Sequence, residues 1–169
     1  MDEEQFYSPS SAYAEADRRG PDHDAMQIAF YRWRLKARRR HQAEEWEDKK
    51  YTVHSIEPEM PILGKYGIRG FADVAEGWQQ IGAPEGVELL VVYEIKPKIF
   101  SCGALIRQLK VLKNIVSNYA VAQINFKLAV ITAAVLRADD PKLPDFRELW
   151  SGPIFLWDGQ EGFTEAESP

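Results

Sequence analysis

The chain has 169 residues and a formal net charge of −5 at pH 7, which favours a single domain. No run of 18 apolar residues occurs, so we expect no membrane span, and the acidic start, Met1–Glu4, does not resemble a secretory signal. The single cysteine, Cys102, excludes an internal disulfide and a cysteine-based zinc or iron–sulfur site. We therefore expect a cytoplasmic protein.

The charge is unevenly distributed along the chain. Residues 1–24 carry a net charge of −5 and residues 158–169 one of −4, whereas residues 25–157 hold 19 basic and 15 acidic residues. We expect disordered or loosely attached acidic tails at 1–24 and 158–169 around one domain at 25–157. Because that domain is mildly basic, the overall charge does not exclude a nucleic-acid partner.

Hydrophobic periodicity predicts two helices and several strands. In chain order we expect a helix over 24–48, strands over 51–56, 67–74 and 87–95, a helix over 101–119, a strand over 126–135 and a short strand over 154–157. Asp22 or Asp24 should cap the first helix and Ser101 the second. The prolines of residues 57–61 should interrupt the first strand or leave it at an edge. The order predicts an α/β (α+β) fold with a mixed central sheet flanked by helices.

Three polar residues are candidates for chemistry at one end of this sheet. Glu94 and Lys96 lie two residues apart at the end of a mostly apolar strand and share a face. Asp73 ends the preceding strand, and the intervening 20 residues suit a hairpin that brings Asp73 beside them. Phosphodiester hydrolysis uses a divalent cation, which prefers oxygen ligands, together with a positioned acid–base group. The residue types therefore indicate Mg²⁺ or Mn²⁺ as cofactor.

The Glu-x-Lys triplet alone is a weak signal. A second one, Glu47–Lys49, occurs at the polar end of the first predicted helix. Glu94 and Lys96 could likewise be a strand end that emerges into solvent. Their context favours chemistry, because charges that close an apolar strand are costly to bury unless they are paired or metal-bound.

These motifs resemble the PD-(D/E)xK nuclease superfamily, the restriction-endonuclease-like group, over roughly residues 25–135. The residues that carry the resemblance are Gly67–Asp73, Glu94–Lys96 and Arg107-Gln108. It implies an αβββαβ core. It also implies metal ligation by Asp73, Glu94 and the Ile95 carbonyl, with Lys96 as the catalytic lysine and Gln108 as the helix glutamine of the exonuclease-like branch. Ala72 and Leu112 depart from the proline and tyrosine of the family's motifs.

Many members of this superfamily add a further acid from the first helix or strand. The candidates here are Glu44, Glu45, Glu57 and Glu59. We prefer Glu59 as an additional metal ligand, because Met60-Pro61-Ile62 resembles the strand that follows such an acid. A solvated loop glutamate is the alternative.

Basic residues on the two predicted helices are candidate phosphate contacts. They are Arg32, Arg34, Arg38, Arg39 and Arg40 on the first helix, and Arg107, Lys110 and Lys113 on the second, where they could extend the same patch. The first group could equally be a solvated helix face balanced by the acids that follow it.

The sequence thus predicts a Mg²⁺- or Mn²⁺-dependent nuclease that hydrolyses phosphodiester bonds of DNA in preference to RNA. The first alternative is a non-catalytic subunit of the same fold that serves in nucleic-acid binding or assembly. A second is a structural or regulatory α/β protein with a chance motif. A homodimer or a larger assembly stays open.

Overall fold

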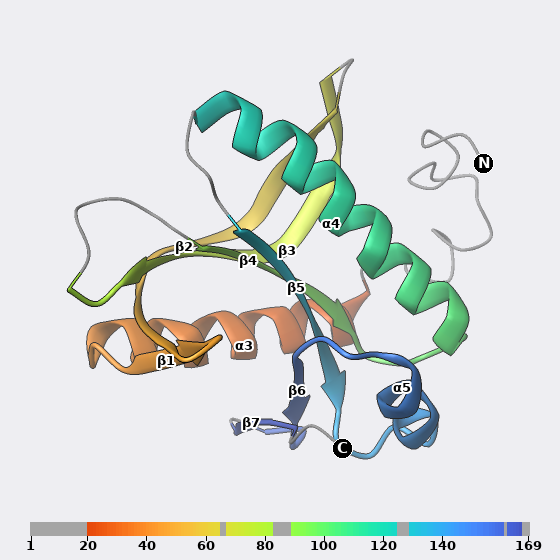
Figure 1. Cartoon of the computed structure of the whole chain (residues 1–169). Helices are drawn as coiled ribbons and strands as arrows, with labels where there is room; N and C mark the ends of the chain where they lie inside the picture. The colour runs from red at the N-terminus through yellow and green to blue at the C-terminus, as the bar shows by residue number, and fades with distance from the viewer. Residues whose placement is uncertain (1–19, 65–66, 83–88, 125–128, 161, 167–169) are drawn as a thin grey trace.

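A computed structural model describes residues 20–64, 67–82, 89–124, 129–160 and 162–166 (Figure 1). This part of the chain forms one mixed α/β structure. Its helices are α3 (Pro21–Arg39), α4 (Cys102–Ile124) and α5 (Leu143–Leu149). Its strands are β1 (Ala43–Trp46), β2 (Lys49–Gly64), β3 (Gly67–Gln80), β4 (Leu89–Lys96), β5 (Ala129–Arg137), β6 (Ile154–Trp157) and β7 (Phe163–Glu165).

The seven strands form a single curled sheet in the order β1-β2-β3-β4-β5-β6-β7. Neighbouring strands are antiparallel except β4–β5 and β5–β6, which are parallel. A parallel pair needs a long crossover, and α4 is part of the segment that connects β4 to β5. The mixed sheet flanked by helices that the sequence predicts is confirmed.

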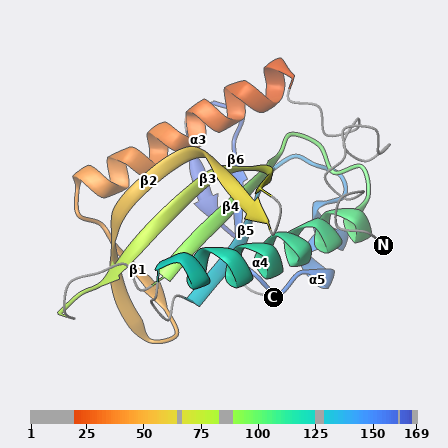
Figure 2. The ribbon, with the colours of Figure 1, turned by 90° about the horizontal axis from the view of Figure 1, so that it is seen from above.

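Helices cover both faces of the sheet, as Figure 2 shows for α3 and α4. Alternating residues of β4 supply both cores, because successive side chains of a strand point to opposite faces. Tyr93 and Ile95 pack with Phe30 of α3, whereas Val92 packs with Leu112 of α4. The helix α5 packs beside α4 in a third cluster. All residues of β4 except Leu90 are buried, as expected for a central strand.

The first helix is shorter than predicted. It ends at Arg39 rather than at residue 48, and residues 43–46 form β1, which pairs with the start of β2. The connecting residues Glu47 and Asp48 both have positive φ, as a tight hairpin turn requires. At the other end, Gly20 is the N-cap, so the predicted cap is wrong and the two aspartates lie in the first turn.

The hairpin of β2 and β3 is longer than predicted. The strand β2 continues to Gly64 through both prolines, because β1 pairs only with residues 49–52 and leaves the rest of β2 at the edge of the sheet. An edge strand tolerates proline, since one of its sides needs no backbone donor. The paired strand β3 likewise runs to Gln80, beyond the predicted end at residue 74.

The C-terminal region is partly folded onto the domain. Phe163 of β7 is 6% exposed and packs in the cluster under α3, so the described residues 162–166 are not part of the loosely attached tail that the sequence suggested. Ile154–Trp157 forms a strand as predicted, and the Ser101 hydroxyl accepts a hydrogen bond from Ala104 N at the start of α4. Residues 1–19, 126–128 and 167–169, on which other expectations fall, lie outside the described residues.

Within the described residues, none of the helices has the length and apolarity needed to cross a bilayer.

Candidate active site

The candidate active site lies where β3 and β4 part. Val74 and Tyr93 are the last paired residues of these two strands. Beyond that pair, β3 remains paired with β2 and β4 remains paired with β5. Asp73 and Glu94 are the next residues on their strands, and Asp73 Oδ2 accepts a hydrogen bond of 2.8 Å from Ile95 N. The structure therefore holds Asp73 against the Glu94–Lys96 segment, as the hairpin spacing predicts. We call Asp73, Glu94, Lys96 and Gln108 the fork site.

A second set of contacts joins the fork site to α4. Gln108 Nε2 donates a 2.9 Å hydrogen bond to Glu94 Oε1, and Lys96 Nζ lies 3.3 Å from the same oxygen. Glu94, Lys96 and Gln108 are all buried, with at most 8% of each exposed. The alternative that Glu94 and Lys96 form a strand end that emerges into solvent is therefore wrong. Gln108 Oε1 is buried and accepts no hydrogen bond from the described residues, which leaves a costly open acceptor at the site.

Two residues of α3 contact Asp73, and neither was predicted from the sequence. His23 Nε2 lies 3.1 Å from Asp73 Oδ1, and Gln27 Nε2 donates a 2.8 Å hydrogen bond to the Asp73 carbonyl. They lie four residues apart, so they share one face of the helix. That face also buries Met26 and Phe30. A polar pair at helical spacing beside a buried apolar stripe is the signal that could have identified them.

Glu59 lies beside Asp73 on the neighbouring strand. It stands between Pro58 and Met60, whose partners on β3 are Val74 and Ala72, the two neighbours of Asp73. Glu59 is exposed, and its φ of 53° is unusual for a strand residue. The other candidate acids lie elsewhere: Glu57 is opposite Ala75, Glu45 is opposite Lys50, and Glu44 binds Arg34.

The basic residues divide into three groups. Arg32, Arg38, Arg39 and Arg40 are all exposed on α3 or directly after it, as a contact with phosphate would require. Arg34 is only 1% exposed, so its assignment to a nucleic-acid surface is wrong. Arg107, Lys110 and Lys113 lie on α4. Because α3 and α4 cover opposite faces of the sheet (Figure 2), the groups on the two helices do not form the continuous patch that the sequence suggested.

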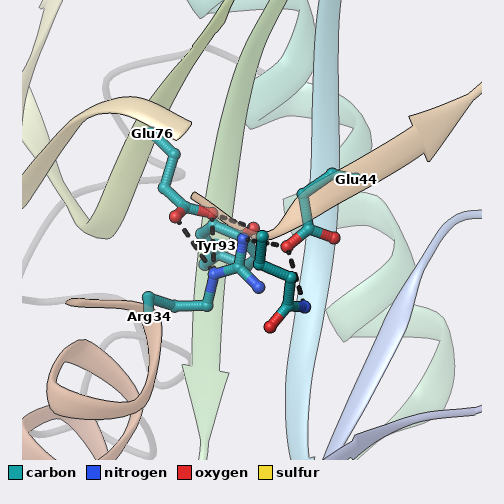
Figure 3. A network of polar contacts seen from close by, with 5 residues as sticks. Arg34, Glu44, Glu76 and Tyr93 are labelled. Atoms are coloured by element: carbon teal, nitrogen blue, oxygen red, sulfur yellow. Dashed lines mark hydrogen bonds and ion pairs between the residues drawn. The ribbon is translucent and has the colours of Figure 1, made fainter. Parts of the chain in front are cut away.

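Arg34 belongs to a buried network that ties α3 to three strands (Figure 3). Its Nε lies 3.1 and 3.0 Å from the two carboxylate oxygens of Glu76, and its Nη2 lies 3.0 Å from Glu44 Oε1. Tyr93 donates a hydrogen bond to Glu76 from the other side. Burial raises the pKa of Glu76, a rise that Arg34 opposes. Burial and the Glu76 charge raise the pKa of Tyr93 well above its usual value. The sequence did not reveal this network, because its members are far apart in the chain.

The donors at the fork site suit a hard divalent cation. Two carboxylates and the Ile95 carbonyl offer oxygen only, which Mg²⁺ and Mn²⁺ prefer. Within the described ranges, no group of three or more His, Cys, Asp or Glu side chains is placed to hold a metal. A cation at this site would therefore complete its coordination with the backbone, water or a substrate phosphate, as Mg²⁺ commonly does.

The fold and the site together define a mixed α/β protein with two carboxylates, a lysine and a glutamine gathered at a fork between two strands. Comparison with known proteins finds no matching family model, no matching curated protein and no matching solved structure.

Proposed function

We propose that this chain is a Mg²⁺- or Mn²⁺-dependent deoxyribonuclease of the PD-(D/E)xK type. The observation that carries the proposal is the hydrogen bond from Ile95 N to Asp73, which joins the first carboxylate to the Glu94–Lys96 segment. The chain order α3, β2, β3, β4, α4, β5 is consistent with a restriction-endonuclease-like αβββαβ core, to which β1, α5, β6 and β7 would be additions.

Burial of the fork site supports a role in chemistry. A buried ion pair gains little net stability, because the loss of hydration offsets the attraction between the charges. Glu94 and Lys96 are nevertheless both buried, and they end a strand whose other side chains form the core. Functional sites commonly retain such groups at a cost in stability.

Each residue of the fork site has a role in this proposal. The Asp73 and Glu94 carboxylates and the Ile95 carbonyl would hold the cation, which supplies charge neutralisation and an activated water. Lys96 carries three donors and a positive charge, so its ammonium would orient the attacking water and offset charge that develops on the phosphate. Gln108 holds Glu94 in place and presents its open oxygen as an acceptor for water.

Cleavage assays with the purified protein test the proposal. Supercoiled plasmid, linear duplex DNA, single-stranded DNA and RNA are each incubated with Mn²⁺, with Mg²⁺ and with chelator. We expect metal-dependent cleavage of DNA and weaker cleavage of RNA. Binding of DNA without cleavage under every condition would contradict the nuclease and support the non-catalytic subunit. The absence of both would support a structural protein.

Thermal unfolding tests the metal site independently of cleavage. Mn²⁺ should raise the melting temperature of the wild type, because the folded state binds the cation and the unfolded state does not. Glu94→Gln should lose most of this increase, since the amide is a weaker cation ligand than the carboxylate. Glu47→Gln is the matched control, because Glu47 is the exposed glutamate of the second Glu-x-Lys triplet. A full increase in Glu94→Gln would show that Glu94 is only a structural partner of Lys96.

A further inference from the structure

A polar hollow lies at the C-terminal end of α3, away from the fork site. It has a volume of about 510 Å³ and is formed by the helix end together with β2 and β3. Its polar lining consists of Arg38, Arg39, His41, Thr52, His54 and Gln79. None of the described residues that line it is acidic, and neither arginine forms an ion pair within the described part of the chain.

The end of α3 and a β-bulge place both histidines at this hollow. His41 follows the C-cap Arg40 and has a φ of 51°, as the residue that ends a helix commonly does, and its N–H donates a hydrogen bond to the Arg38 carbonyl. His54 is the extra residue of a β-bulge, because its neighbours Val53 and Ser55 pair with the consecutive residues Trp78 and Gly77. A bulge re-aims a side chain, and bulges are over-represented at sheet edges and next to active sites. The helix end and the bulge therefore bring both histidines to the lining of the hollow that also holds the two arginines.

The chemistry of the lining matches a phosphate group. Arginine offers a planar fork of donors that fits phosphate oxygens, and imidazole, hydroxyl and amide groups add further donors. The carbonyls at the end of α3 would disfavour an anion. The Lys36, Ala37 and Arg38 carbonyls, however, accept backbone hydrogen bonds from residues 40, 42 and 41, which reduces that effect.

We propose that this hollow binds one backbone phosphate of the DNA, several base pairs away from the phosphate that is cleaved. This inference rests on the proposed nuclease function. Arg38 follows His23 by 15 residues on α3, about 22 Å at 1.5 Å per residue. His54 precedes Glu59 by five residues on β2, about 17 Å at 3.3 Å per residue. At 3.4 Å per base pair, these spans correspond to about five to seven base pairs of duplex.

DNA binding in chelator tests the hollow without cleavage. Fluorescence anisotropy with a 24-base-pair duplex is measured from low to moderate salt for the wild type and for Arg38→Gln/Arg39→Gln. The slope of log affinity against log salt should become shallower by about 0.9 for each phosphate that the variant no longer neutralises. Lys49→Gln/Lys50→Gln removes the same charge from exposed positions outside the hollow and should leave the slope unchanged. His54→Gln should weaken binding in the same direction as the arginine variant.

Duplex length provides the second measurement. The wild type should lose affinity once the duplex becomes too short to reach from the cleavage site to the hollow, at about six base pairs beyond the scissile phosphate. The arginine variant should not show this step. Equal slopes for the two double variants, or an identical length dependence in wild type and variant, would overturn the proposal.

Further experiments distinguish DNA from other anionic ligands of the hollow. They also test the hollow and the nuclease function separately. If inorganic phosphate alone saturates the hollow at micromolar concentration, its ligand is a small anion and the DNA contact is wrong. If polyglutamate binding depends on the arginines and DNA binding does not, the hollow docks an acidic protein segment. A wild type that binds DNA through the hollow but never cleaves it would contradict the nuclease and leave the phosphate site standing. A wild type that cleaves DNA while the hollow variants are unaffected would do the reverse.

Discussion

Lys96→Ala should reduce DNA cleavage by at least about 100-fold while leaving Mn²⁺ binding nearly intact. A protonated lysine has no lone pair for a metal, so its contribution belongs to the transition state. Loss of one positioned electrostatic group of this kind typically costs about 10²–10³ in rate. Single-turnover cleavage and calorimetric titration with Mn²⁺ measure the two properties separately.

The control for this variant is the lysine of the second Glu-x-Lys triplet. Lys49 is exposed at the start of β2, and Lys49→Ala should cleave DNA at the wild-type rate. Lys96 also lies 3.3 Å from buried Glu94, so unfolding in chelator is measured to establish that Lys96→Ala is folded. Lys96→Met, which retains more of the side-chain volume, serves if the alanine variant is unstable. Cleavage at the wild-type rate by a folded Lys96 variant would contradict the catalytic assignment.

Arg34→Met should lower the free energy of unfolding by about 3–5 kcal/mol, the range observed when one partner of a buried ion pair is removed. The reason is that Glu76 is fully buried and, without the guanidinium that binds both of its oxygens, must either hold an unpaired buried charge or take up a proton, and both cost free energy. Urea unfolding at neutral pH measures the change. Arg32→Met, at an exposed position on the same helix, should change stability by no more than about 0.5 kcal/mol.

A double variant distinguishes two possible causes of this loss of stability, the unpaired charge of Glu76 and the lost packing around Arg34. Arg34→Met/Glu76→Gln removes the charge on both sides while keeping an acceptor for the Tyr93 hydroxyl. It should recover part of the stability, because an amide is cheaper to bury than an unpaired carboxylate. If the double variant is no more stable than Arg34→Met, the loss comes from packing around Arg34 rather than from the unpaired charge.

The sequence predicted the elements whose signal is local. The apolar run at residues 87–95 identified the central strand, and the spacing of Glu94 and Lys96 placed both on one face. The length of the segment between Asp73 and Glu94 predicted the hairpin that brings them together. These inferences depend only on strand periodicity and on the length of the connecting segment, and both can be read from a short stretch of sequence.

Predictions failed where pairing with a distant segment decided the local structure. Residues 43–46 contain an alanine and two glutamates, which have a high helix propensity, but they form β1 because the tight turn at Glu47-Asp48 pairs them with β2. Pro58 remains in a strand because β3 covers one side of β2 and no further strand covers the other there, among the described residues. Phe163 joins the core because β7 pairs with β6. In each case a tertiary contact outweighed a weak local preference.

The sequence by itself determined which residues offer the chemistry of the fork site and that they lie on neighbouring strands. Only the tertiary structure decided which basic side chains face solvent and which residues bind the acidic side chains. Arg34 and Arg38 belong to the same basic run, yet one is buried against Glu76 and the other lines a hollow. His23 reaches Asp73 across 50 residues of chain. Helical spacing specifies only the face on which a side chain lies, whereas its partner depends on the strand against which that face packs, and strand order is not encoded locally.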